Sequence, residues 1–206
     1  APAPQAGGGA PATPAPAQRP PLNFSNQTLR QIVHTSLGGD RVRVVLSNTF
    51  GTAPLVVGRA QVALRDKGPS VVAKTAHPLT FSGNPGMTIP AGAVAFSDPV
   101  ALAVPPLSDL AVDIFLPGDT AANNSPLTLH VGAWQTNYVS MGGNHTGAAT
   151  LPIQTTAPSY FFLSRIDVTV SGETAAIVTF GDSITDGTNS TPNTNNRWPK
   201  IGRAHV

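Results

Sequence analysis

The stretch Asp109-Leu-Ala-Val-Asp-Ile-Phe-Leu116 has the longest alternation of apolar residues in this chain of 206 residues. It places Leu110, Val112, Ile114 and Leu116 on one side of an extended backbone. Successive side chains of a strand point to opposite faces, so this period of two predicts a strand with one face on a core. One covered face and one solvated face are typical of an antiparallel sheet.

Similar stretches lie on both sides of it, separated by turns rich in Pro, Gly, Asn and Asp. They span residues 28–35, 41–47, 56–65, 70–73, 79–81, 94–96, 100–104, 127–131 and 165–170. No helical period persists for three turns. Some nine short strands with turn residues between them predict a mostly β fold, an antiparallel β-sandwich of jelly-roll type, over residues 23–172.

The alternation also predicts which side chains of these strands face the core. They are Val42, Val44 and Leu46; Val56, Ala60, Val62 and Leu64; Leu127, Leu129 and Val131; and Ile166, Val168 and Val170. Val45 is an exception, because it is apolar on the side of its strand that should be polar.

Composition narrows the function classes. At 40% hydrophobic and 11% charged residues the chain can build a core, and with no cysteine it has neither disulfides nor a Cys-ligated metal. The net charge of +2 falls to zero without Lys200 and Arg203, because 10 basic and 10 acidic residues then remain. The charge therefore gives no ground for a nucleic-acid partner. No apolar run reaches the roughly 18 residues of a transmembrane segment, so none is expected.

The N-terminal stretch has the composition of a linker. Residues 1–21 carry seven prolines among Ala and Gly, and such a sequence cannot bury enough apolar area to offset its ordering entropy. We expect residues 1–22 to be a disordered linker. Linkers of this type often follow an export signal, which indicates a secreted or extracytoplasmic protein.

A second informative stretch lies near the C-terminus. Residues 175–180 read Ala-Ala-Ile-Val-Thr-Phe, an apolar run long enough for one buried strand. Gly181 ends the run, and Asp182, Ser183 and Thr185 favour turns and helix N-caps. A serine at the carboxyl end of a buried strand exposes its hydroxyl where ligands bind in open α/β sheets. Its backbone N–H can point at a developing oxyanion. The G-x-S-x-G elbow is excluded, because Thr185 stands where that motif has its second glycine.

Together with the apolar run before it, Phe180-Gly-Asp-Ser-Ile-Thr-Asp-Gly187 resembles the first signature block of the GDSL, or SGNH, hydrolases. The resemblance implies that residues 173–199 begin an α/β, flavodoxin-like domain. It also implies a serine esterase in which Ser183 attacks an ester carbonyl and its backbone N–H is one donor of the oxyanion hole. The ester would be an acetylated carbohydrate, a lipid or a small acyl ester, and no metal or organic cofactor is needed. The competing interpretation is an ordinary strand-to-helix turn capped by Asp182 and Ser183.

The remaining parts of that family's site are expected downstream of the chain's end. The family supplies further oxyanion donors from a glycine and an asparagine, and an Asp-x-x-His pair late in the chain. Residues 201–206, Ile-Gly-Arg-Ala-His-Val, match the translation of a common sequencing-library adapter. We therefore expect residues 200–206 to be adapter read-through, so that His205 is no triad histidine, and the truncated chain to be inactive.

The histidines and aromatic residues upstream leave alternatives open. His34, His77, His130 and His145 lack the spacing of a metal motif, and neither His130 nor His145 is expected to serve as the base for Ser183. Trp134 and Tyr138 flank two amides and could stack on a sugar ring, although burial in the core is the commoner fate of such residues. The alternative function is thus a non-catalytic β-sandwich module for carbohydrate binding or surface adhesion.

Overall fold

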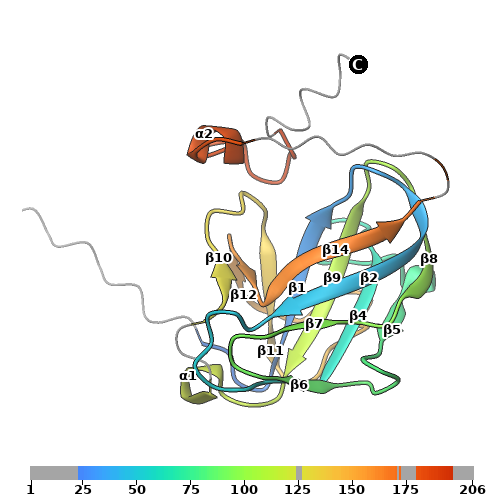
Figure 1. The fold of residues 1–206 in the computed structure, drawn as a ribbon. Helices are drawn as coiled ribbons and strands as arrows, with labels where there is room; N and C mark the ends of the chain where they lie inside the picture. Colours follow the sequence, from blue (N-terminus) through green and yellow to red (C-terminus); the bar gives the residue numbers. More distant parts are fainter. Residues whose placement is uncertain (1–22, 124–126, 171, 173–179, 197–206) are drawn as a thin grey trace, which may run out of the picture.

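A computed structural model describes residues 23–123, 127–170, 172 and 180–196, and over these ranges antiparallel strands dominate (Figure 1). The mostly β class is confirmed. The predicted linker (1–22), most of the predicted strand 175–180 and the predicted adapter-encoded end (200–206) lie outside the described residues.

The larger sheet has six strands and contains the stretch of longest alternation. Its order is β12 (Ile153–Ala157), β11 (Asn137–Gly142), β1 (Gln27–His34), β9 (Asp109–Leu116), β4 (Arg59–Leu64) and β5 (His77–Leu79). The central strand β9 pairs with β1 along its whole length, in a register that puts Gln31 opposite Val112. On its other side β9 pairs with β4.

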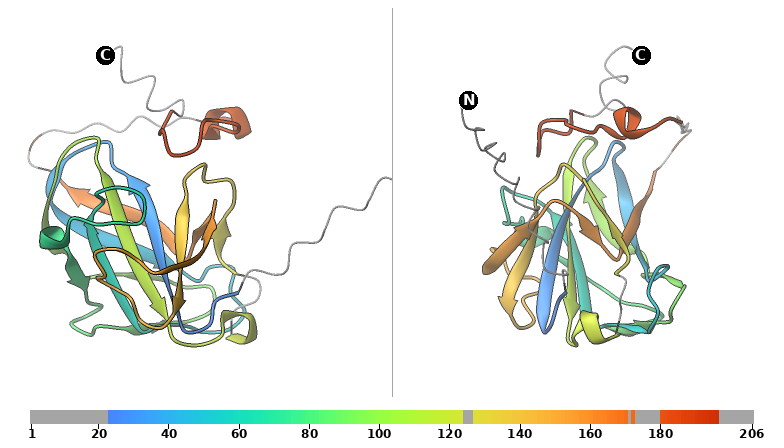
Figure 2. Two further views of the ribbon diagram at one scale, coloured as in Figure 1. Left: turned by 180° about the vertical axis from the view of Figure 1, so that it is seen from behind. Right: turned by 90° about the vertical axis from the view of Figure 1, so that its left-hand side faces the viewer.

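The smaller sheet is built around β2 (Gly39–Ser47), and shorter elements complete the fold (Figure 2). Strands β14 (Leu163–Thr169), β7 (Val94–Phe96) and β8 (Val100–Val104) all pair with β2. Two ribbons join β3 (Leu55–Val57) to β6 (Met87–Ile89) and β10 (Leu129–His130) to β13 (Tyr160–Phe161). The short helical pieces are η1 (Ala73–Thr75), α1 (Thr120–Asn123) and α2 (Ser183–Asp186).

One hydrophobic core lies between the two sheets. It takes Leu110, Val112, Ile114 and Leu116 from β9 and Val42, Val44 and Leu46 from β2, all fully buried as the alternation predicts. The rings of Phe24 and Phe161 meet edge to face in this core, 4.9 Å apart. Because both sheets contribute their inward faces to the same cluster, the arrangement is that of a β-sandwich.

The outer face of the six-stranded sheet is also covered, which the sequence pattern does not predict. Ile32, Ala63 and Ala111 on this face form a second buried cluster with Val71 and Leu151 from two long loops. A half-exposed strand would leave Ala111 in water, whereas here it is 2% exposed. The alternation in β9 thus reflects an apolar face and a mixed face, both of them buried.

Val45 is explained by its neighbours on the outer face of the smaller sheet. It lies opposite Phe96 of β7 and Arg165 of β14, and side chains of directly paired residues share a face. The Phe96 ring lies between two guanidinium groups, 5.2 Å from that of Arg43 and 5.5 Å from that of Arg165. These long side chains leave Val45 fully buried on a side that faces away from the core.

Three predicted inward positions are wrong. Val56 is 46% exposed, because residues 55–64 form two strands, and β3 turns Leu55 and Val57 inward instead. Gly58 separates strands β3 and β4, and a Cβ at this position would clash with the Phe115 ring. Leu129 and Val131 are 38% and 69% exposed, because β10 is a two-residue strand that pairs only with β13, and Val131 follows it outside any strand.

Candidate active site

Ser183 is the first residue of α2, a single helical turn, and its side chain is exposed. Asp182 is the N-cap of this turn, and its carboxylate accepts a hydrogen bond from the Ile184 N–H at 3.0 Å. Ser183 therefore does not cap the turn. The competing interpretation, a turn capped by Asp182 and Ser183, is correct for Asp182 and wrong for Ser183. The first N–H groups of a helix have no partner inside it, so the Ser183 N–H stays available at the same end as its hydroxyl.

Two glycines close the turn around Ser183. A Cβ on Gly181 would overlap the Thr185 hydroxyl, so any other residue at this position would require Thr185 to move. Gly187 ends the turn in the left-handed region (φ 91°), and its N–H donates to the Ile184 carbonyl at 3.1 Å. The Thr188 N–H adds a 2.8 Å bond to the Ser183 carbonyl. The main chain on both sides of Ser183 is thereby fixed by local bonds.

The apolar side chains beside Ser183 are not covered by any described part of the chain. Phe180 is 101% exposed and lies in no strand, and Ile184 is 75% exposed. The predicted strand 175–180 stays a prediction, because residues 175–179 lie outside the described ranges.

Asn193 holds the segment after Ser183 against the β-domain. Its side-chain oxygen accepts bonds from the Thr136 N–H (2.7 Å) and from the buried Gln135 amide (2.9 Å). Its side-chain amide donates to the Thr136 hydroxyl, and its backbone N–H donates to the Trp134 carbonyl, both at 2.9 Å. This segment crosses the end of the sandwich below α2 (Figure 1). The Asn193 contacts place the Ser183 turn at that end.

The other predicted positions are spread over the domain. Tyr138 is 8% exposed and Trp134 is half-buried, so the sugar-stacking role considered for this pair is wrong for Tyr138, which belongs to a buried cluster. Among the described residues no group of three or more His, Cys, Asp or Glu could hold a metal ion. In the described part of the chain, the side chains of His77, His130 and His145 form no hydrogen bond with Ser183.

A polar cluster that sequence reasoning missed lies where β1 ends and β9 begins. The Nδ1 of His34 is 2.8 Å from one carboxylate oxygen of Asp109, and the other oxygen accepts a bond from Arg65 at 2.9 Å. The side-chain amide of Asn195 approaches the same carboxylate at 3.4 Å. No spacing along the chain reveals this cluster, because its members meet only through the pairing of β1, β9 and β4. Asp109 orients the His34 ring, as a carboxylate does beside a catalytic or ligating imidazole.

Comparison with known proteins leaves the resemblance of the Ser183 block untested. No protein-family model matches the chain. No curated protein matches it significantly either. Within the described part of the chain, every helix is too short or too polar to cross a lipid bilayer.

Proposed function

We propose that this chain carries the first part of a secreted serine ester hydrolase of the GDSL/SGNH type. The β-sandwich, of jelly-roll type, precedes an α/β domain that begins at residue 173. Ser183 attacks the ester carbonyl, its hydroxyl proton passes to the alcohol that leaves, and water then hydrolyses the acyl-enzyme to release the acid and return the proton to Ser183. The Ser183 N–H donates to the oxyanion that forms during the attack. No metal takes part in these steps.

The observation that supports this proposal is the closed turn from Gly181 to Gly187. A nucleophilic serine needs an exposed hydroxyl on a backbone that does not move when the substrate binds. The turn meets this need, since Asp182 and Gly187 fix its two ends by hydrogen bonds while the Ser183 side chain stays exposed. An ordinary surface turn does not need a glycine at position 181. Here a Cβ at that position would overlap the Thr185 hydroxyl.

The experiment compares p-nitrophenyl acetate hydrolysis by the protein expressed from its complete gene and by its Ser183→Ala variant. We expect the variant to lose on the order of 10⁴-fold in kcat, because removal of a nucleophile leaves only binding and oxyanion stabilisation. Ser190→Ala is the matched control, since Ser190 lies in the same segment but outside the turn. Equal rates for the Ser183→Ala variant and the parent protein would refute the proposal.

A further inference from the structure

Three adjoining hollows follow β14 along the edge of the smaller sheet. They have volumes of about 280, 220 and 250 Å³. The first and second share Tyr160, Leu163 and Ser164, and the second and third share Val33 and His34. Because neighbouring hollows share lining residues, the three adjoin one another in a row, and this row is called here the β14 groove. Its length suits an extended ligand better than a compact one.

The middle of the β14 groove contains an imidazole with a defined hydrogen-bonding state. Asp109 accepts bonds from Arg65 and from His34 Nδ1, and an ionised carboxylate can only accept, so the proton lies on Nδ1. Nε2 of neutral His34 is then an acceptor. This atom is buried and has no hydrogen-bond partner among the described residues. A buried acceptor without a donor carries a desolvation cost that a ligand hydroxyl can relieve.

The first hollow offers ring faces beside hydroxyl groups. The rings of His130 and Tyr160 stack at 6.4 Å with an interplanar angle of 21°, and Phe50, 65% exposed, lies on the rim. Thr49, Thr128 and Ser164 supply hydroxyls to the same hollow. A sugar ring has an apolar face that packs on aromatic rings and a rim of hydroxyls that both donate and accept.

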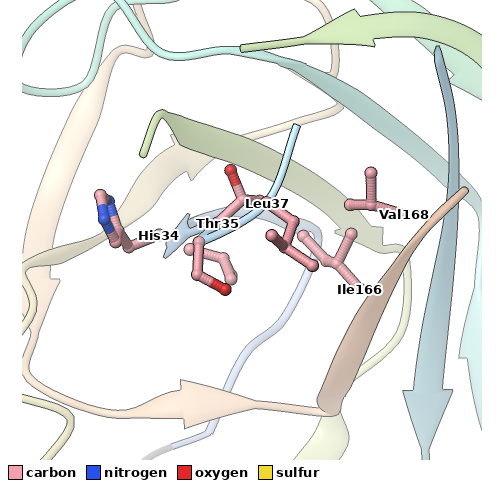
Figure 3. Close-up of a pocket in the computed structure, with 7 residues that line it drawn as sticks. His34, Thr35, Leu37, Ile166 and Val168 are labelled. Atoms are coloured by element: carbon pink, nitrogen blue, oxygen red, sulfur yellow. The ribbon is translucent and has the colours of Figure 1, made fainter. Parts of the chain in front are cut away.

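The third hollow is lined partly by apolar side chains. Ile166 and Val168 of β14 face Leu37 across it, with His34 at the end farthest from Val168 (Figure 3). A fatty acyl chain would need such a lining along the whole groove. The hydroxyls of the first hollow and the Arg165 and Asn195 side chains of the second are unsuited to an acyl chain. The lining as a whole thus favours a ligand with both hydroxyls and apolar ring faces.

We propose that the β14 groove binds an oligosaccharide. One sugar ring packs on Phe50, His130 and Tyr160, and a hydroxyl of a neighbouring sugar donates to Nε2 of His34. Binding requires no reaction at Ser183, so the site stands or falls independently of the esterase proposal. If both hold, the groove lies on the same polypeptide as the reactive serine and holds the carbohydrate part of an acetylated substrate.

The test is isothermal titration of the 206-residue chain with xylohexaose, cellohexaose and mannohexaose, and with palmitate and an alternating Val–Thr octapeptide as competitors of other classes. We expect at least one hexasaccharide to bind, and Phe50→Ala to weaken that binding about tenfold through loss of a stacking anchor. His34→Ala should weaken it as well, while His77→Ala, a histidine outside the groove, should not.

Each other outcome would overturn the proposal. Binding of palmitate or of the peptide in place of the sugars would assign the groove to a different ligand. Lack of binding by all three sugars would refute it. Sugar binding that Phe50→Ala leaves unchanged would place the site elsewhere. Phe50 is a rim residue, so this variant remains informative even if His34→Ala disturbs the Asp109 cluster and the fold.

Discussion

Arg30 of β1 and Asp113 of β9 form a two-pronged ion pair on the covered outer face of the larger sheet. Nε of Arg30 lies 2.7 Å from Oδ1 of Asp113, and Nη2 lies 2.7 Å from Oδ2. The two side chains are 0% and 3% exposed. Arg30 also donates to the carbonyls of Pro69 and Ala148, so the pair ties two long loops to the sheet.

We predict that Asp113→Leu destabilises the protein by about 3–5 kcal/mol, because it leaves the Arg30 charge buried without its partner. Arg30→Met should destabilise the protein by a similar amount, because it leaves the Asp113 charge buried without its partner. The double variant should lose much less than the sum of the two, since neither charge then remains in the interior. Urea denaturation of the four proteins gives the coupling energy, and additive losses would contradict the prediction.

The turn around Ser183 gives a second prediction. Gly181→Ala should distort the turn, because the new methyl group overlaps the Thr185 hydroxyl. Thr185→Ala should relieve this overlap only in part, because the Cβ of residue 185 would still lie 2.9 Å from the new Cβ. Amide chemical shifts of residues 182–188 report both changes. A Gly181→Ala spectrum that matches the parent's would show that the turn tolerates a side chain there.

The sequence predicts the sandwich class well because the class depends on local patterns. β9 alone carries four core positions at a period of two, and β2 carries three more. The sequence does not predict the second covered face, because Ala111 and Asp113 are buried by loops that are distant in the chain. For the same reason the Asp109–His34–Arg65 cluster cannot be derived from spacing. Ser183 can be proposed from the sequence because its surroundings are local: a cap, a turn and two glycines.

The contacts of Asn193 predict a local effect on dynamics. Asn193→Ala removes three side-chain hydrogen bonds to Gln135 and Thr136. Because these bonds are partly exposed, their loss should lower the free energy of local opening of residues 187–196 by roughly 1–2 kcal/mol. This corresponds to about 5- to 30-fold faster amide exchange in those residues. Exchange in β9 should not change, because the variant leaves the global stability intact.

Asn196→Ala is the control for this experiment. Asn196 is exposed and makes no side-chain bond to the described residues. Equal exchange in the Asn193→Ala and Asn196→Ala proteins would mean that Asn193 does not hold the segment.

Asp98 predicts a pH-dependent part of the stability. The Thr80 hydroxyl, above all, and the N–H groups of Gly83 and Ser82 donate to its carboxylate and hold its pKa below the ordinary value of 3.8. A group whose pKa is lower in the folded state stabilises the fold above its unfolded pKa, and this contribution is lost as the pH falls through the folded value. Asp98→Asn should therefore lower the melting temperature near neutral pH.

The difference in melting temperature between Asp98→Asn and the parent should shrink as the pH falls below about 4. Asp40→Asn, at an exposed aspartate without side-chain bonds to the described residues, serves as the control. Calorimetric scans from pH 2.5 to 7 measure both variants. A difference in melting temperature that stays constant over this pH range would show that the charge on Asp98 does not contribute to the stability.

The anchoring of Asn193 makes a closed loop out of the chain that contains Ser183. One end of this loop is fixed where Thr169 pairs with Arg41, and the other where Asn193 meets residues 134–136. The entropy lost on closing a loop grows only with the logarithm of its length, about 0.6 kcal/mol for each doubling. Insertions between the two anchors should therefore cost little. The position of Asn193 at the end of the sandwich is set by its own contacts and does not depend on the length of chain between the two anchors.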